Sequence, residues 1–215
     1  MGTDSNEKGT SGERPPRFSM LREYALADVI TLANASSGTA SIFMCLQYLD
    51  TGREFYLWIA FGLIPLALIF DFLDGAVARW RHRKSRLGAD LDSLSDIVSF
   101  GVAPAVLAFT LGMRGGIDAA FLIFFVASGI SRLARYNVTA DELSDESGKV
   151  EYYEGTPIPT SIVLVAVLAA AFATDAVFEG LWLGMIDLGF ARWHPLSTIF
   201  LLSGCAMVSQ RLRIP

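Results

Sequence analysis

The sequence predicts an all-α, polytopic membrane protein with six transmembrane helices. Hydrophobic residues make up 53% of its 215 residues and charged residues only 18%, whereas an ordinary soluble domain is about 25% charged. The mean hydropathy is +0.45. Six apolar segments approach the length of about 20 residues that a spanning helix needs, and they lack the alternation of barrel strands. The predicted spans are Ala27–Leu49, Phe55–Trp80, Leu87–Leu111, Ile117–Tyr136, Pro157–Phe178 and His194–Gln210.

The segment before the first span has a different composition. Residues 1–16 are rich in Gly, Ser, Thr, Glu and Pro and show no apolar period, which predicts a disordered tail. Residues 17–215 then form one membrane domain. Its first part, Arg17–Ala27, is either a short amphipathic helix lying at the membrane interface or a plain linker.

Lys and Arg residues are distributed unevenly over the predicted connections. The 2–3 connection reads WRHRKSR from Trp80, and further basic residues lie at the end of the fourth span and at the C-terminus. With six spans, these basic ends share one side of the membrane. The positive-inside rule makes that side cytoplasmic, in the endoplasmic reticulum of a eukaryote or in a prokaryotic cytoplasmic membrane. A net charge of −5 gives no reason to expect a nucleic-acid partner.

Four aspartates border the basic 2–3 connection. Asp71 and Asp74 are three residues apart, and Gly88, Asp92 and Asp96 follow one another at intervals of four, so each set shares a helix face. Two antiparallel helices would therefore present four carboxylates to each other. Each carboxylate costs about 2.5–3.5 kcal/mol at the centre of a membrane helix, and a hard divalent cation is the simplest compensation. We expect Mg²⁺ or Mn²⁺, as two ions about 3.5–4 Å apart.

Small residues accompany the aspartates. Gly75, Ala78 and Gly88 leave room for a bulky group against the backbone, and Arg79 follows directly. A nucleotide diphosphate fits this pattern, with Arg79 near its phosphates. For the glycines, close helix packing is the alternative interpretation.

Together these residues match the signature of the CDP-alcohol phosphatidyltransferase family. The pattern is D-x-x-D-G-x-x-A-R, eight residues, then G-x-x-x-D-x-x-x-D, and all its fixed positions are present. The resemblance implies a six-helix membrane enzyme, usually dimeric. It also implies that Asp71, Asp74 and Asp92 are metal ligands. Asp96 would bind the second metal and act as the general base for an alcohol that attacks a CDP-linked lipid, releasing CMP.

Other segments resemble the phosphatidylserine synthase branch of this family, which implies CDP-diacylglycerol and L-serine as substrates. The segments are ADVITLANASSG from Ala27, DSLSDIVSFGVAPA from Asp92, ISRLARYNVT from Ile130, YYEGTPIPTS from Tyr152 and the C-terminal 22 residues from His194.

The end of the fourth span supplies groups for this acceptor. Arg135 is expected to bind the serine carboxylate bidentately and Arg132 to reach the lipid phosphate, with Tyr136 and Asn137 shaping the serine pocket. The alternative is that both arginines only obey the positive-inside rule or bind lipid headgroups.

The first span contributes two further polar candidates. Thr31 and Asn34 are three residues apart, and we expect them to contact the CDP-lipid. A hydrogen bond between helices is the alternative for Asn34.

Two rival functions remain at this point. The same chemistry with inositol or glycerol 3-phosphate is the nearer one, because the signature does not name the alcohol. A metal-ion transporter is the distant one, since it would spread its acidic residues along a path through the membrane.

Overall fold

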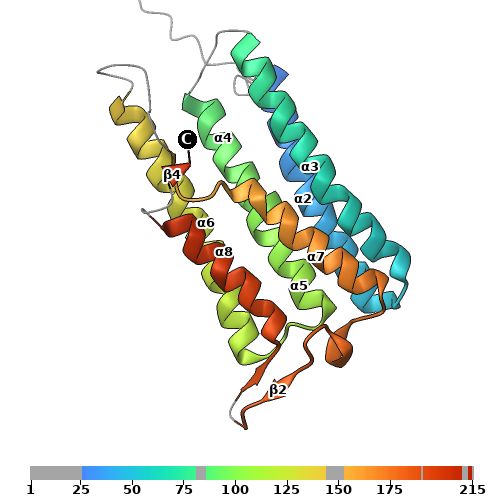
Figure 1. Cartoon of the computed structure of the whole chain (residues 1–215). Coiled ribbons are helices and arrows are strands. Elements are labelled where there is room, and N and C mark those ends of the chain that lie inside the picture. Colours follow the sequence, from blue (N-terminus) through green and yellow to red (C-terminus); the bar gives the residue numbers. More distant parts are fainter. Residues whose placement is uncertain (1–25, 81–85, 144–152, 190, 210–212, 215) are drawn as a thin grey trace, which may run out of the picture.

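The computed structural model describes residues 26–80, 86–143, 153–189, 191–209 and 213–214. Its helices run side by side in one elongated bundle (Figure 1). The α-helices are α2 (Leu26–Thr51), α3 (Glu54–Trp80), α4 (Arg86–Asp96), α5 (Ala103–Leu111), α6 (Gly116–Leu143), α7 (Ile162–Ala173) and α8 (Thr198–Val208). A π-helical turn, η1 (Ile97–Val102), joins α4 to α5. Short 3₁₀ turns are η2 (Ile158–Ser161), η3 (Phe178–Gly180) and η4 (Pro195–Ser197).

In the part of the chain that the structure describes, two small antiparallel pairings accompany the helices. Strand β1 (Tyr153–Glu154) pairs with β4 (Arg213–Ile214). Strand β2 (Ile186–Asp187) pairs with β3 (Arg192–Trp193) in a hairpin at the lower end of the bundle (Figure 1). Each strand has only two residues, so the fold remains helical in character.

Within the described residues, four helical segments are long and apolar enough to cross a membrane. They are Ala27–Thr51, Glu54–Val77, Leu87–Leu111 and Gly116–Val138, which confirms the polytopic character expected from the sequence. The two remaining apolar helices are shorter, at Ile158–Ala173 and Pro195–Val208, because turns and loops occupy the ends of the predicted fifth and sixth segments.

The ends of the chain's elements differ from the prediction in places. Helix α6 continues to Leu143, seven residues beyond the predicted end of the fourth span. The residues after Tyr136 are largely polar, so a prediction from hydropathy ends the span before the helix itself ends. The predicted tail and the alternatives for Arg17–Ala27 lie almost wholly outside the described residues, as does the basic connection 81–85.

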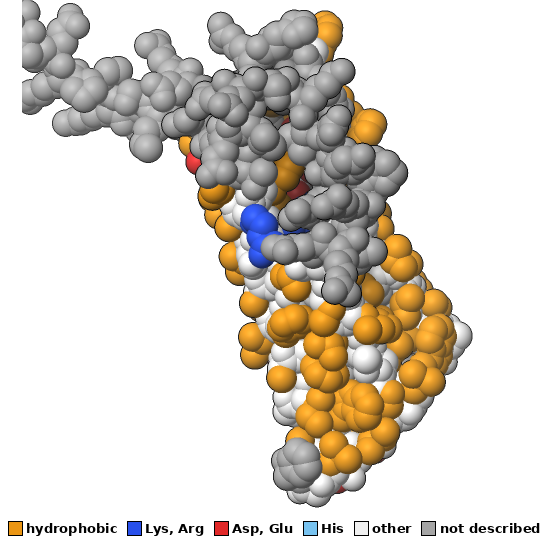
Figure 2. Space-filling view, turned by 60° about the vertical axis from the view of Figure 1, so that its left-hand side comes forward, with side chains coloured by type: hydrophobic (Ala, Val, Ile, Leu, Met, Phe, Trp, Pro, Cys, Tyr) orange, Lys and Arg blue, Asp and Glu red, His pale blue; other side chains and the backbone are white. Residues whose placement is uncertain are grey.

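The bundle surface is dominated by apolar side chains. On the face shown in Figure 2 they spread over most of the described surface, and the Lys and Arg side chains lie in its upper half. Exposed large residues include Phe43 on α2, Ile69 on α3, Ile123 on α6 and Leu202 on α8, each more than half exposed. So many exposed apolar side chains on several helices indicate a lipid-facing exterior.

Helices α2 and α3 form an antiparallel pair at one side of the bundle. The Ser41 hydroxyl of α2 donates a 2.9 Å hydrogen bond to the Ala60 carbonyl of α3. At the far end, Phe172 of α7 packs against Trp58 and Phe61 of α3. Between α6 and α8, Phe125 and Phe200 meet edge to face with ring centroids 5.3 Å apart. The first two contacts hold α3 to α2 and α7, and the third holds α6 to α8.

The third span is interrupted by η1 directly after Asp96. The Ala103 amide bonds the Val98 carbonyl, five residues earlier, which is the π-helical pattern. Gly38 of α2 lies against this turn, and a Cβ on Gly38 would be 2.4 Å from the Ser99 Oγ. Helix α2 and the π-helical turn are therefore in backbone contact beside the aspartates.

A buried carboxylate, that of Asp118, connects two helices at the opposite end of the bundle. The Asp118 Oδ1 accepts hydrogen bonds from the His194 amide and the Ser197 hydroxyl, both at 2.8 Å. Its Oδ2 accepts one from the Gly115 amide and lies 2.7 Å from His194 Nδ1. Asp118 is in the first turn of α6, so it caps that helix and ties it to the start of α8. Nothing in the local sequence indicates this contact, because Asp118 and His194 are 76 positions apart.

Candidate active site

The aspartates lie where α3 ends and the third span begins. Asp71 and Asp74 are in the last three turns of α3, and Asp92 is in α4. One carboxylate oxygen from each of these three lies within 4.8 Å of the others. Two oxygens bound to one Mg²⁺ ion with bonds of about 2.1 Å are at most about 4.2 Å apart. The antiparallel helices therefore bring the three carboxylates almost to the spacing of ligands on a common ion.

The surroundings of these carboxylates also suit a cation. Asp74 is only 6% exposed. Its Oδ2 and the Oδ1 of Asp92 are buried without a hydrogen-bond partner among the described residues. Buried carboxylate oxygens without donors are costly unless a positive charge compensates them. The three aspartates thus fit a divalent metal ion.

Asp96 lies beside the three-carboxylate group without being part of it. It is the last residue of α4, it is 7% exposed, and it contacts Asp71. Its Oδ1 accepts a hydrogen bond of 3.3 Å from the Asn34 Nδ2 of α2. Asp71 thereby connects Asp96 to the other two carboxylates.

The side of helix α2 that faces the aspartates carries two polar residues. Thr31 and Asn34 are both buried. The Thr31 hydroxyl donates to the Ala27 carbonyl at 3.0 Å, and the side chain also contacts Asp74. Thr31 and Asn34 therefore each reach one of the aspartates directly.

The two arginines of α6 differ in their surroundings. Arg132 is half-buried, and it interacts electrostatically with Asp96 and Tyr136. Its Nε is buried without a hydrogen-bond partner in the described part of the chain. Arg135 is exposed, as is Tyr136 at 46%. Arg132 thus interacts with one of the four aspartates, whereas the side chain of Arg135 is exposed.

The remaining candidates are placed as follows. Asn137 of α6 and Ser93 of α4 bond to each other, with the Asn137 Nδ2 donating at 3.1 Å. Gly75 and Gly88 are half-buried at the facing ends of α3 and α4. Ala78 and Arg79 belong to α3, but their side chains lie outside the described residues.

Sequence reasoning missed two serines at this site. Ser93 bonds Asn137, and the Ser99 hydroxyl donates to the backbone carbonyl of Asn34 at 2.9 Å. Polar residues inside an apolar segment are the signal that could have found them, because hydrogen bonds between helices commonly use such residues.

Comparison with known proteins adds two findings. A family model described as CDP-alcohol phosphatidyltransferase matches residues 24–202, which include all four aspartates and the arginine pair.

Several curated proteins are similar along most of the chain. The CDP-diacylglycerol–serine O-phosphatidyltransferase of Saccharomyces cerevisiae is 43% identical over 212 residues, covering 97% of this chain and 76% of the yeast protein. Proteins of the same name from Mycobacterium bovis and Methanocaldococcus jannaschii are 32% and 34% identical over 184 and 148 residues. These alignments cover 85% and 69% of this chain, and 60% and 62% of the relatives.

Proposed function

The chain belongs to the CDP-alcohol phosphatidyltransferase family, and we propose that it transfers a phosphatidyl group from CDP-diacylglycerol to L-serine, giving phosphatidylserine and CMP. The observation that carries this proposal is the convergence of Asp71, Asp74 and Asp92 beside Asp96. The names of the similar yeast, mycobacterial and archaeal proteins support serine as the acceptor alcohol.

The three clustered aspartates are the proposed metal ligands. Asp71, Asp74 and Asp92 would hold Mg²⁺ or Mn²⁺, with Asp96 joining them for a second ion. When bound, the ions would neutralise the diphosphate of the CDP-lipid and stabilise charge on the transferring phosphoryl group.

Asp96 is the proposed general base. It lies at the edge of the carboxylate group and would accept the proton of the serine hydroxyl. The serine oxygen then forms a bond to the phosphorus of the phosphatidyl group, the bond from that phosphorus to the CMP oxygen breaks, and CMP leaves with the electron pair. Holding the hydroxyl beside the phosphorus supplies much of the rate enhancement.

The lipid donor would lie against the facing ends of α3 and α4. Gly75, Ala78 and Gly88 leave space there for the CDP group, and Arg79 would bind its phosphates. Thr31 and Asn34 of α2 border the same space.

The serine acceptor would lie between α4 and α6. Arg132 and Arg135 would bind the serine carboxylate and the lipid phosphate between them, and Tyr136 and Asn137 would line the pocket. The electrostatic interaction of Arg132 with Asp96 supports the first of these arginines as a substrate ligand near the reacting atoms.

Incubation of the purified chain with CDP-diacylglycerol, Mn²⁺ or Mg²⁺ and one alcohol at a time tests the proposal. We expect CMP release with L-serine and a lipid product carrying a primary amine and a carboxylate. Release with inositol or glycerol 3-phosphate, and none with serine, would overturn serine as the acceptor.

The proposed topology has six spans with both termini in the cytoplasm. The aspartates flank the basic 2–3 connection in the sequence, since Asp71 and Asp74 are in the last three turns of α3 and Asp92 and Asp96 are in α4. The site would therefore face the cytoplasm, by the positive-inside rule.

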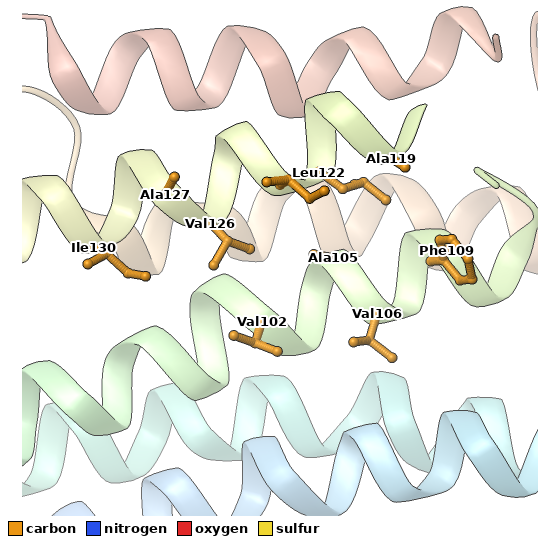
Figure 3. A pocket seen from close by; sticks show the side chains of 10 residues that line it. Val102, Ala105, Val106, Phe109, Ala119, Leu122, Val126, Ala127 and Ile130 are labelled. Atoms are coloured by element: carbon orange, nitrogen blue, oxygen red, sulfur yellow. The ribbon is translucent and has the colours of Figure 1, made fainter. Parts of the chain in front are cut away.

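We also propose that the chain forms a homodimer through α5 and α6. An apolar groove of about 520 Å³ lies between these helices (Figure 3). Its lining residues are Val102, Ala105, Val106, Phe109, Ala119, Leu122, Ile123, Val126, Ala127 and Ile130. Three small alanines among them would allow a second copy to approach closely.

A further inference from the structure

The structure contains a contact between α2 and the third span that the proposed reaction does not itself explain. Asn34 is completely buried and donates its amide to the Asp96 carboxylate at 3.3 Å. We propose that Asn34 is a positioning residue, which sets the direction of the Asp96 carboxylate relative to the three clustered aspartates. This inference rests on the proposed function, in which Asp96 accepts the serine proton.

Asn34 is itself held in place by η1. Its backbone carbonyl accepts a hydrogen bond of 2.9 Å from the Ser99 hydroxyl, three residues after Asp96. The side chain of Asn34 and its backbone are thus bonded to two residues of one helical turn. Two bonds from one residue to consecutive parts of the third span fix both the distance and the rotation of Asp96 toward α2.

Gly38 completes this attachment one turn further along α2. A Cβ at Gly38 would lie 2.4 Å from the Ser99 Oγ and 2.7 Å from its Cα. A side chain at position 38 would push the two backbones apart and lengthen both Asn34 bonds. The close approach of the helices is therefore a condition for the contact between Asn34 and Asp96.

The chemistry of the amide explains why an asparagine suits this position. A neutral N–H donor fixes a carboxylate without adding charge beside three other aspartates, and in a buried site such a bond is strong. The amide must present nitrogen to the carboxylate, because its oxygen would be repelled. The Asn34 Oδ1 is then left buried, without a partner among the residues that the structure describes.

Steady-state kinetics of Asn34→Ala in the full chain test the positioning role. We expect kcat to fall about 100-fold, since misplacement of a reacting group by about 1 Å can cost that much, with the KM for CDP-diacylglycerol nearly unchanged. Ser36→Ala is the matched control, because Ser36 is exposed on α2 and donates its hydroxyl to the Leu32 carbonyl of its own helix. An unchanged kcat would overturn the inference. So would a large rise in the CDP-lipid KM at constant kcat, which would indicate a direct substrate contact.

Two further variants test the same geometry independently of Asn34→Ala. Ser99→Ala removes the second bond without adding volume, and Gly38→Ala separates the backbones. Both should lower kcat in the same direction. Gly62→Ala on α3 is the control for the glycine, since a Cβ there meets nothing within 4 Å. Wild-type kcat in both Ser99→Ala and Gly38→Ala would contradict the inference.

An exchange of the two side chains separates the pairing from the catalysis. In chelator, Asn34→Asp should lower the Tm because two carboxylates face each other, and the double variant Asn34→Asp with Asp96→Asn should recover it. The double variant should nevertheless show no turnover, because the carboxylate that pairs with the amide is then at position 34 on α2 and no longer at position 96. A Tm that does not recover would refute the pairing. This readout needs no substrate, so it stands even if the wild type fails to use serine.

Discussion

At the scale of single residues, the site divides its four carboxylates into two roles. Asp71, Asp74 and Asp92 share a small volume, and Asp96 is turned toward an amide donor. The first arrangement suits an ion, and the second suits a proton acceptor that must point in one direction. A substitution that removes the charge of Asp96 but keeps its shape should therefore affect chemistry more than binding.

We predict that Asp96→Asn lowers kcat by at least about 100-fold, since general-base catalysis contributes about 10²–10⁴-fold. Binding of CDP-diacylglycerol should be largely retained, because the three clustered aspartates are untouched. CMP release measures the first effect and calorimetric titration with the CDP-lipid the second. Turnover near the wild-type rate would exclude Asp96 as the base.

The arginine pair offers a second test at this scale. Arg135→Ala should raise the KM for serine much more than the KM for CDP-diacylglycerol, if its guanidinium binds the serine carboxylate. Arg132→Ala, measured in parallel, shows whether the half-buried arginine near Asp96 carries that contact instead. Equal changes of both KM values in both variants would indicate that neither arginine discriminates between the substrates.

At the scale of elements, the two ends of the bundle are fixed by different means. At the catalytic end, α2 meets η1 through Asn34, Ser99 and Gly38. At the opposite end, Asp118 receives hydrogen bonds from the segment before α6 and the segment before α8. The second contact is distant from the aspartates, so its loss should affect folding and not the reaction.

We predict that Asp118→Ala destabilises the protein by about 3 kcal/mol, because it leaves several buried donors without an acceptor. The Tm in detergent should fall, and kcat at a temperature where the variant is folded should be close to that of the wild type. Asp50→Ala, an exposed aspartate at the end of α2, serves as the control. A Tm equal to that of the wild type would show that the cluster contributes little stability.

The elements also show what could be predicted from the sequence. Spacing alone placed Asp71 with Asp74 and Asp92 with Asp96, because a regular helix repeats its faces locally. It could not pair Asn34 with Asp96 across 62 positions or Ser93 with Asn137 across 44. Such contacts depend on which helices pack together. Nor did hydropathy reveal η1, because its residues, Ile97–Val102, are mostly apolar whichever type of helix they form.

At the scale of the whole molecule, the apolar groove between α5 and α6 is the feature that the monomer leaves open (Figure 3). It lies on the part of the third and fourth spans beyond the aspartates and Arg132. A second copy could therefore cover it without blocking the site.

We predict that a cysteine at Ile123, which lines this groove, crosslinks two copies in lipid vesicles at a low ratio of protein to lipid. Cys45 and Cys205 are first replaced by serine. A cysteine at Val163 of α7, which is exposed to a similar degree at 62% against 69%, should not crosslink. Equal crosslinking at both positions would indicate random collision, and none at Ile123 would argue against this dimer face.

The π-helical turn η1 rotates the side chains of α5 relative to those of α4 around the axis of the third span. A turn with one extra residue shifts every later side chain by about 100° around the axis, since an α-helix advances one turn in 3.6 residues. The part before the turn can thus be aligned for its carboxylates and the part after it for its apolar neighbours. The extra residue therefore lets the carboxylates and the apolar side chains each face their own partners within one span. Deletion of a single residue from 97–102 would force both parts into one phase, so either the site or the packing would lose its register.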